Sequence, residues 1–119
     1  MYVNLFIAPV PDANRDAYLE HCTAFGEIIR EHGCLRYVEC WEEDVADGDL
    51  TSFLKAVDKR EGESVVVGWG EWPDKATSDA AMEKVMADER MAAMEMPFDG
   101  KRLIYGGFTT ILDARDVDG

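Results

Sequence analysis

Apolar and polar positions follow two rhythms along the chain, and together they predict a unit of strand, helix and strand that occurs twice. Residues 2–10, 35–42, 64–72 and 101–112 alternate at every second position or are rich in β-branched and aromatic side chains, as strands are. Residues 12–32 and 74–94 place apolar side chains three and four positions apart, as the buried face of a helix requires. The predicted order is therefore β-α-β-β-α-β.

The residues at the ends of these segments refine the prediction. Asp12 and Asp74 precede the two helices, and their carboxylates can cap the free amide groups of a first turn. Gly33 suits the left-handed backbone just past a helix end. Residues 42–49 (EEDVADGD) are expected to form an exposed loop. Residues 51–57 are either a short irregular strand or an arm that reaches across a neighbour. Residues 90–94 are either the end of the second helix or a separate short turn.

Two features of the predicted elements concern packing. The first helix carries an apolar stripe that is predicted to be buried: Tyr18, Cys22, Phe25, Ile29 and His32. The third strand carries Gly68 and Gly70 on one face, where missing side chains predict a bulge or a close approach of backbone.

Two such units joined into one sheet predict the ferredoxin-like α+β sandwich, an antiparallel sheet with two helices on one face. We expect one domain over residues 1–112, followed by a polar tail over residues 113–119. The other face of the sheet would carry some of the following aromatic side chains in any register: Phe6, Tyr37, Trp41, Trp69 and Phe108. An apolar face of this kind usually marks an interface, so we expect a homodimer that could close a barrel across the pair. The alternative is a monomer that seats a long-chain ligand there.

Charge excludes several classes of partner. The chain of 119 residues has 25 acidic and 12 basic side chains and a net charge of −13. This charge repels nucleic acid and anionic membranes, and it indicates either solubility or an acidic docking surface. We find neither a basic leader with an apolar run nor a segment long enough to span a membrane. The three cysteines have no scaffold spacing, which favours reduced thiols in the cytoplasm.

One candidate site lies on the strands. If the strands align in register, the open face would gather an amide, aromatic rings and carboxylates, namely Asn4, Tyr37, Glu39, Trp41, Trp69 and Glu71. Such a site suits a planar phenolic or quinone-like substrate, with Glu39 as a base and Asn4 as its catalytic partner. The alternative is that Glu39 pairs with Arg36 or Arg102 at a dimer seam and that the aromatic rings are core.

A second candidate site surrounds the last turn. Arg102, Lys101 and Tyr105 could bind an anionic part of a ligand beside Asp99. The alternative is an ion pair that stabilises the turn. A phosphate loop is disfavoured at Gly106 and Gly107, because no helix follows them.

The sequence gives little support for a metal site or for a catalytic nucleophile. His32, Cys34 and Cys40 lack the paired two-to-four-residue spacing of zinc sites, so we expect no metal. A cysteine–histidine nucleophile is possible, but no third group to orient it is visible. We expect no cofactor.

Several segments resemble the YbaA-like family, a bacterial family of unknown function, over nearly the whole chain. They are residues 31–40 (EHGCLRYVEC), 51–53 (TSF), 56–57 (AV), 96–102 (MPFDGKR) and 104–108 (IYGGF). The resemblance implies the dimeric α+β barrel fold and no established activity.

The wider dimeric-barrel class includes cofactor-free monooxygenases, haem-degrading enzymes and ligand binders. Asn4 and Trp69 are similar to residues of the haem-degrading type. That type takes its iron ligand from a histidine of the second helix, whereas His21 and His32 both lie on the first.

Two functions follow as hypotheses. The first is a small dimeric protein that binds an apolar or aromatic metabolite between sheet and helices, with monooxygenase-like or isomerase-like turnover. The second is a non-catalytic interaction or stress-related protein that docks a partner through the acidic loop at residues 42–49.

Overall fold

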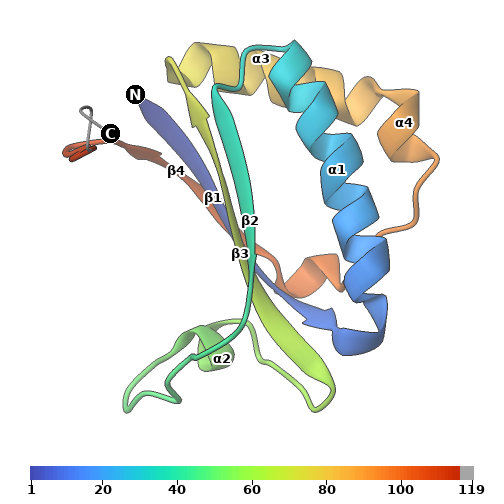
Figure 1. The fold of residues 1–119 in the computed structure, drawn as a ribbon, viewed down its shortest axis with the longest axis vertical. Coiled ribbons are helices and arrows are strands. Elements are labelled where there is room, and N and C mark those ends of the chain that lie inside the picture. The colour runs from blue at the N-terminus through green and yellow to red at the C-terminus, as the bar shows by residue number, and fades with distance from the viewer. Residues whose placement is uncertain (116–119) are drawn as a thin grey trace.

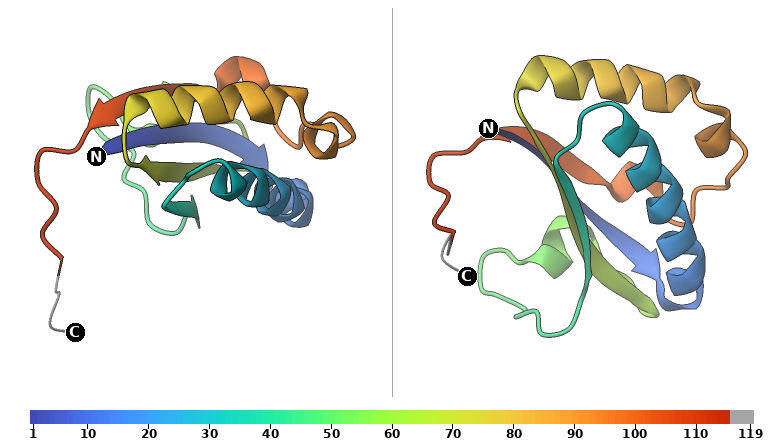
Figure 2. Two further views of the ribbon diagram at one scale, coloured as in Figure 1. Left: turned by 90° about the horizontal axis from the view of Figure 1, so that it is seen from above. Right: turned by 45° about the horizontal axis from the view of Figure 1, so that its top comes forward.

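A four-stranded antiparallel sheet carries two helices on one of its faces (Figure 1). The computed structural model describes residues 1–115, so the part of the predicted polar tail at residues 116–119 lies outside the described residues. The sheet order is β2-β3-β1-β4, with strands β1 (Tyr2–Pro11), β2 (Arg36–Trp41), β3 (Glu63–Trp72) and β4 (Ile104–Thr109). The long helices are α1 (Arg15–Glu31) and α3 (Lys75–Ala87), which contact each other over the sheet (Figure 2). The predicted ferredoxin-like α+β fold is confirmed.

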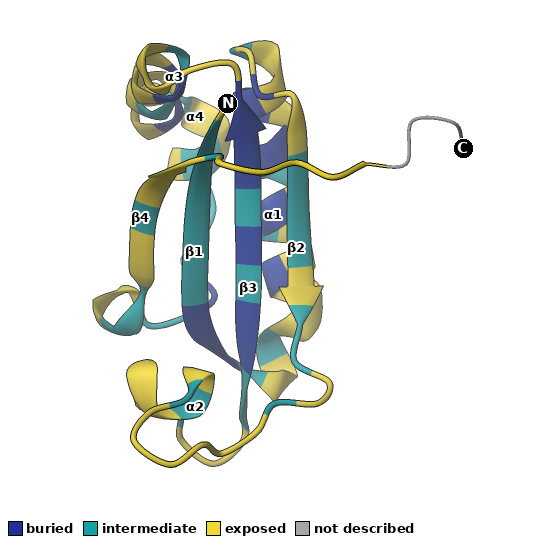
Figure 3. Cartoon of the chain, turned by 90° about the vertical axis from the view of Figure 1, so that its left-hand side faces the viewer, coloured by how far each residue is buried: buried dark blue, intermediate teal, exposed yellow. Residues whose placement is uncertain are grey.

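Short helices complete the chain: η1 (Asp12–Asn14), α2 (Phe53–Ala56), α4 (Glu89–Ala92) and η2 (Gly100–Arg102). The second long helix ends at Ala87, because the Asp88 carboxylate accepts the Arg90 amide at 2.8 Å and starts α4, so a separate short turn follows the helix. Within residues 51–57 the helix α2 forms in place of a strand, since the Ser52 hydroxyl accepts the Lys55 amide at 3.0 Å. α2 lies on the side of the sheet away from α1 and α3 (Figure 3).

The predicted helix ends are partly confirmed. Asp74 caps α3 by accepting the Thr77 amide at 2.8 Å, and Gly33 has a φ of 105° just past α1. The prediction that Asp12 caps the first helix is wrong. Its amide donates to the Gly62 carbonyl at 2.8 Å and its carboxylate accepts the Ser64 hydroxyl, so Asp12 is tied to β3 and α1 begins at Arg15.

The strand register decides which side chains face the helices. β1 and β3 pair without interruption from Tyr2–Trp72 to Pro11–Glu63, so no bulge occurs at Gly68 or Gly70. The helix-facing side carries Asn4, Phe6 and Ala8 of β1, Tyr37, Glu39 and Trp41 of β2, and Val66, Gly68, Gly70 and Trp72 of β3. The open side carries Val3, Leu5, Ile7, Val38, Val67, Trp69, Glu71, Ile104 and Phe108.

The prediction that six site residues share the open face is therefore wrong. Trp69 pairs with Leu5 on one side and Val38 on the other, and this register sends Trp69 and Glu71 to the open side. The remaining four residues, Asn4, Tyr37, Glu39 and Trp41, lie under the helices.

Two groups of buried side chains hold the layers together. One contains Ile28, Ile29, Cys34, Trp72, Ala81 and Val85, where α1 and α3 meet the end of the sheet. The other contains Ala8, Val10, Tyr18, Cys22 and Val66 beneath the N-terminal half of α1. Within residues 1–115, none of the helices is both long and apolar enough for a membrane crossing.

Candidate functional site

A cavity of about 440 Å³ lies between the helices and the helix-facing side of the sheet. Members of both buried groups line it. Apolar side chains form most of the lining, and apart from methionines they are Phe6, Ala8, Phe25, Val66, Val85, Ala92, Phe98 and Leu103. Four of the six methionines also line it, namely Met86, Met91, Met94 and Met96. Flexible thioether side chains adapt to varied ligand shapes.

A carboxylate held by two tyrosines is the polar centre of this cavity. Tyr37 and Glu39 point to the same face of β2 because they are two residues apart. The Tyr37 hydroxyl donates to one oxygen of Glu39, and the Tyr18 hydroxyl, from α1, donates to the other at 2.7 Å. All three side chains line the cavity.

Two glycines make room for this cluster. Gly68 pairs with Glu39 across the β2–β3 ladder, and a Cβ at Gly68 would overlap the Glu39 carboxylate. A Cβ at Gly26 of α1 would lie 2.9 Å from Cδ2 of Tyr37. The missing side chain predicted to mark a close approach at Gly68 thus accommodates a carboxylate instead of backbone.

The other titratable groups of the cavity are neutral near pH 7. Burial and the charge of Glu39 raise the pKa of Tyr18 and of Tyr37. Burial raises the pKa of the Cys22 thiol to about 12. Burial also lowers the pKa of His21, whose Nδ1 is buried and has no hydrogen-bond partner among residues 1–115.

The other two predicted residues on the helix-facing side lie outside the cavity lining. The amide oxygen of Asn4 accepts the Ser78 hydroxyl at 2.6 Å, which ties β1 to α3. The Trp41 ring packs 6.3 Å from Tyr18 and lies 5.1 Å beneath the Arg15 guanidinium. Asn4 and Trp41 therefore support the fold around the site.

Trp69 and Glu71 form a separate cluster on the open side. The Trp69 indole donates to Glu71 at 3.2 Å, and the Arg115 guanidinium donates to the other carboxylate oxygen at 3.1 Å. Arg36 lies 3.8 Å from the same carboxylate. These residues border a shallow pocket that the sheet separates from Glu39.

The structure shows the ion pair that the sequence offered as the alternative at the last turn. Arg102 donates to both oxygens of Glu63 at 2.7 Å, to Asp99 at 3.1 Å and to the Asp58 carbonyl at 2.9 Å. Its guanidinium is thus occupied by the protein itself. Tyr105 is 74% exposed on the edge strand β4. The sequence also offered an ion pair of Glu39 with Arg36 or Arg102. Within the described chain Glu39 forms neither pair, because its oxygens accept the two tyrosine hydroxyls.

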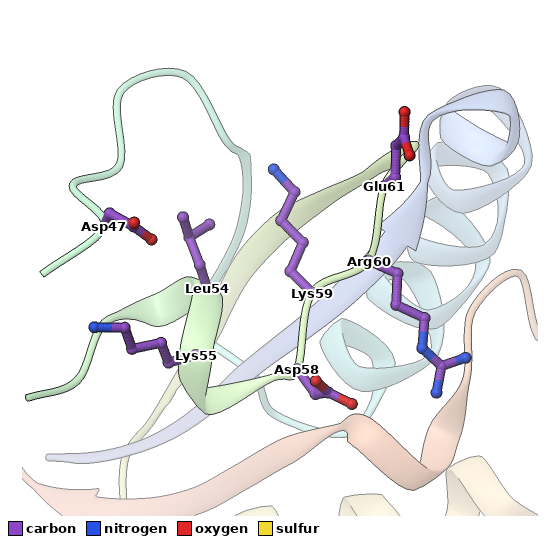
Figure 4. A pocket seen from close by; sticks show the side chains of 7 residues that line it. All are labelled: Asp47, Leu54, Lys55, Asp58, Lys59, Arg60 and Glu61. Atoms are coloured by element: carbon purple, nitrogen blue, oxygen red, sulfur yellow. The ribbon is translucent and has the colours of Figure 1, made fainter.

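A further pocket, beside α2, offers little chemistry. Asp47, Lys55, Asp58, Lys59, Arg60 and Glu61 border it together with Leu54. Figure 4 shows the charged ends of Lys55, Arg60 and Glu61 pointing away from one another. Lys55 donates to the Asp49 carbonyl at 2.6 Å and Lys59 pairs with Glu42 at 3.2 Å. Because Lys55 and Lys59 are engaged by the protein and the other charges have both signs, this pocket is the weaker candidate.

No group of three or more metal-ligating side chains lies together within residues 1–115. His32, Cys34 and Cys40 are dispersed: His32 follows α1, Cys34 is buried and Cys40 is exposed on β2. The Cys34 thiol lies 3.3 Å from the Arg36 carbonyl.

Sequence reasoning missed Tyr18, His21, Cys22 and Phe98 as parts of a site. It placed Tyr18 and Cys22 in a buried stripe, which is where they are. A tyrosine within an apolar stripe needs a hydrogen-bond partner, and this requirement was the available signal.

The fold and cavity together define a small ferredoxin-like α+β protein with a ligand-sized space between its layers. A similar fold occurs in an uncharacterised NIPSNAP domain protein of Burkholderia xenovorans, with a TM-score of 0.57, 18% identity and coverage of 98% of this chain and all of that one. A protein of Agrobacterium tumefaciens has a TM-score of 0.52 at 13% identity over 92% of both chains. These two likenesses concern the fold alone.

The family described as "Protein of unknown function (DUF1428)" matches residues 1–100, and the chain belongs to this family. The uncharacterised protein YbaA of Escherichia coli K12 is 48% identical over 114 residues, which cover 94% of this chain and 97% of that protein. YbaA of Shigella flexneri matches to the same extent. The resemblance to the YbaA-like family is confirmed.

Proposed function

We propose that this protein binds a small apolar or aromatic metabolite in the cavity between its helices and its sheet. The observation that carries the proposal is an apolar space of about 440 Å³ with a single tyrosine-held carboxylate. Binding sites for small molecules have volumes of roughly 300–1,000 Å³ and combine mostly apolar walls with a few polar groups that orient the ligand. Glu39, Tyr18 and Tyr37 are those polar groups here.

The arrangement favours binding over the monooxygenase-like turnover considered from the sequence. Asn4, the expected catalytic partner of Glu39, is engaged by Ser78 outside the cavity lining. Both oxygens of Glu39 already accept a tyrosine hydroxyl. A substrate proton would therefore have to reach Glu39 beside these two donors.

A neutral fluorescent probe tests the proposal. N-phenyl-1-naphthylamine should bind to the wild type with enhanced fluorescence and a stoichiometry of one per chain. Ala8→Phe should weaken this binding about tenfold or more, because Ala8 lines the cavity and is only 2% exposed, so the added ring occupies the space. Ala92→Phe is a second test variant for the case in which Ala8→Phe does not fold. Ala92 is exposed on α4 and also lines the cavity, so its new ring fills the same space.

Ala87→Phe is the matched control, because Ala87 is exposed and outside the cavity lining. It should bind the probe as the wild type does. Failure of the wild type to bind, or equal binding by all three variants, would contradict the proposed site.

We also propose that two copies pair through their open sheet faces. Ile104 is 40% exposed and Phe108 is 57% exposed, and both continue the apolar rows of Val3, Leu5 and Ile7. The radius of gyration is 15.2 Å, whereas a compact chain of this length has about 13.5 Å. A chain that is extended and leaves apolar strands uncovered is typical of one half of a dimer.

Sedimentation equilibrium should give a mass of twice the 13.3 kDa of one chain. Phe108→Lys should shift the protein toward the monomer, because a charge would be placed within the apolar face. Tyr105→Lys is the control, since Tyr105 is 74% exposed on the opposite side of the same strand. A monomeric wild type, or a dimer that Phe108→Lys does not affect, would overturn this pairing.

We also propose that the protein is cytoplasmic. Cys22, Cys34 and Cys40 are all free thiols, and two of them are buried. Thiols of this kind persist in a reducing compartment.

A further inference from the structure

We propose that the ligand of the cavity is an organic amine, with its ammonium group on Glu39 and its apolar body among the aromatic and methionine side chains. This inference rests on the proposed function, because it names the chemical class of the molecule that the cavity binds. It follows from the charge of the site, from the free acceptor positions on Glu39 and from the surrounding rings.

The charged side chain of the cavity lining is a carboxylate, so the lining is negative. Among residues 1–115, Glu39 is the only carboxylate that borders the cavity, and no lysine or arginine borders it. The nearest arginine along α1, Arg15, lies over the ring of Trp41. The remaining titratable groups of the lining are neutral tyrosine, cysteine and histidine side chains. An anionic ligand would meet an acceptor of its own charge without a cation to offset it, which is unfavourable in an apolar space.

Glu39 has acceptor capacity that the protein does not use. A carboxylate offers about four lone-pair positions. Tyr18 and Tyr37 take one on each oxygen, and the Cys22 thiol, a weak donor, lies close enough to take a third, so at least one position is open to a stronger donor. An ammonium group donates up to three hydrogen bonds and also supplies the positive charge that a partly buried carboxylate needs. A neutral hydrocarbon supplies neither.

Aromatic rings also surround the carboxylate. Phe25 and Tyr37 pack edge to face with centroids 5.4 Å apart, and Tyr18 and Phe98 do so at 5.8 Å. The rings of Tyr18 and Tyr37 are fixed next to the carboxylate by their own hydroxyl groups. Together these rings give the apolar body of the amine a surface to pack against. The net charge of −13 further draws cations toward the protein.

Three compounds of nearly equal size and different charge provide the test. They are 2-phenylethylamine, which is a cation at pH 7, the neutral 2-phenylethanol, and the anion phenylacetate. Each displaces N-phenyl-1-naphthylamine from the cavity in a competition titration. The amine should bind about tenfold or more tightly than the alcohol, as expected for a charge-assisted hydrogen bond, and phenylacetate should bind most weakly.

Two variants connect this preference to the carboxylate. Glu39→Gln keeps the shape of the side chain and should reduce the preference for the amine over the alcohol to near equality. Gly68→Ala should do the same by displacing the Glu39 carboxylate, which a Cβ at this position would overlap. Gly70→Ala is its control on the same strand and face, because its Cβ would lie 3.3 Å from Nε1 of Trp72 and away from Glu39.

The outcomes separate the two proposals. If the neutral probe binds but the three compounds compete equally, or if the preference for the amine persists in Glu39→Gln, the amine inference is wrong and the cavity remains a binding site. If the probe itself fails to bind to the wild type, the proposed function is wrong.

Discussion

Replacing Trp72 with alanine is expected to lower the free energy of unfolding by about 3–5 kcal/mol, the usual range for removal of a fully buried tryptophan. Trp72 is 0% exposed at the end of β3 and packs in the group that contains Ile28 and Ile29 of α1 and Ala81 and Val85 of α3. The substitution would leave a void where both helices rest on the sheet. Because a domain of this size has only about 5–15 kcal/mol of stability, this loss would bring the variant near to unfolding.

Trp72→Phe separates packing from hydrogen bonding. The indole Nε1 of Trp72 is buried and has no hydrogen-bond partner in the described part of the chain, so phenylalanine loses no hydrogen bond. We expect Trp72→Phe to cost about 1–2 kcal/mol, well below the alanine variant. Urea titrations followed by circular dichroism at one protein concentration measure both values. A Trp72→Ala variant within about 1 kcal/mol of the wild type would show that the helices do not depend on this side chain.

Removing the Tyr37 hydroxyl is expected to have the second-largest effect on the free energy of unfolding. Tyr37→Phe takes away one of the two donors to Glu39 and should cost about 2 kcal/mol, because hydrogen bonds to charged groups contribute roughly 1.5–3 kcal/mol. Tyr105→Phe is the control: Tyr105 is 74% exposed, and its variant should have nearly the stability of the wild type.

A double-mutant cycle shows whether the hydroxyl acts through the carboxylate. In a Glu39→Gln background the same Tyr37→Phe change should cost only about 1 kcal/mol, since a neutral acceptor forms the weaker hydrogen bond. Urea titration of the four proteins gives the coupling energy. An equal cost in both backgrounds would mean that the Tyr37 hydroxyl does not stabilise the protein by way of Glu39.

The architecture was predictable because each element has its own periodicity. The repeats of two and of three to four positions are local properties, and they identified four strands and two long helices in the correct order. The same reasoning could place Tyr37, Glu39 and Trp41 on one face of their strand. It could not relate that face to the face of Trp69, because the pairing of Trp69 with Val38 is a contact between distant segments.

Two other features depended on distant partners in the same way. Asp12 has the composition of a helix cap, but its hydrogen bonds to Gly62 and Ser64 outweigh that local preference. Gly68 stood out as a missing side chain, yet only the register shows that Glu39 occupies the space above it. The cavity itself arises from how far apart the two layers lie, and no pattern within a single segment records this separation.

The hydrogen bonds of Arg102 also determine how the fold responds to acid. They join Glu63 at the start of β3, Asp99 before η2 and the backbone of Asp58 after α2. Because Arg102 donates to its carboxylate, the pKa of Glu63 lies below its usual value. The stability that this difference contributes is fully present above the unfolded pKa of about 4.3 and is lost as the pH falls through the lower folded value. Acidification therefore loosens the junction of α2, η2 and β3 through Glu63, on segments remote in sequence from the carboxylate of the cavity.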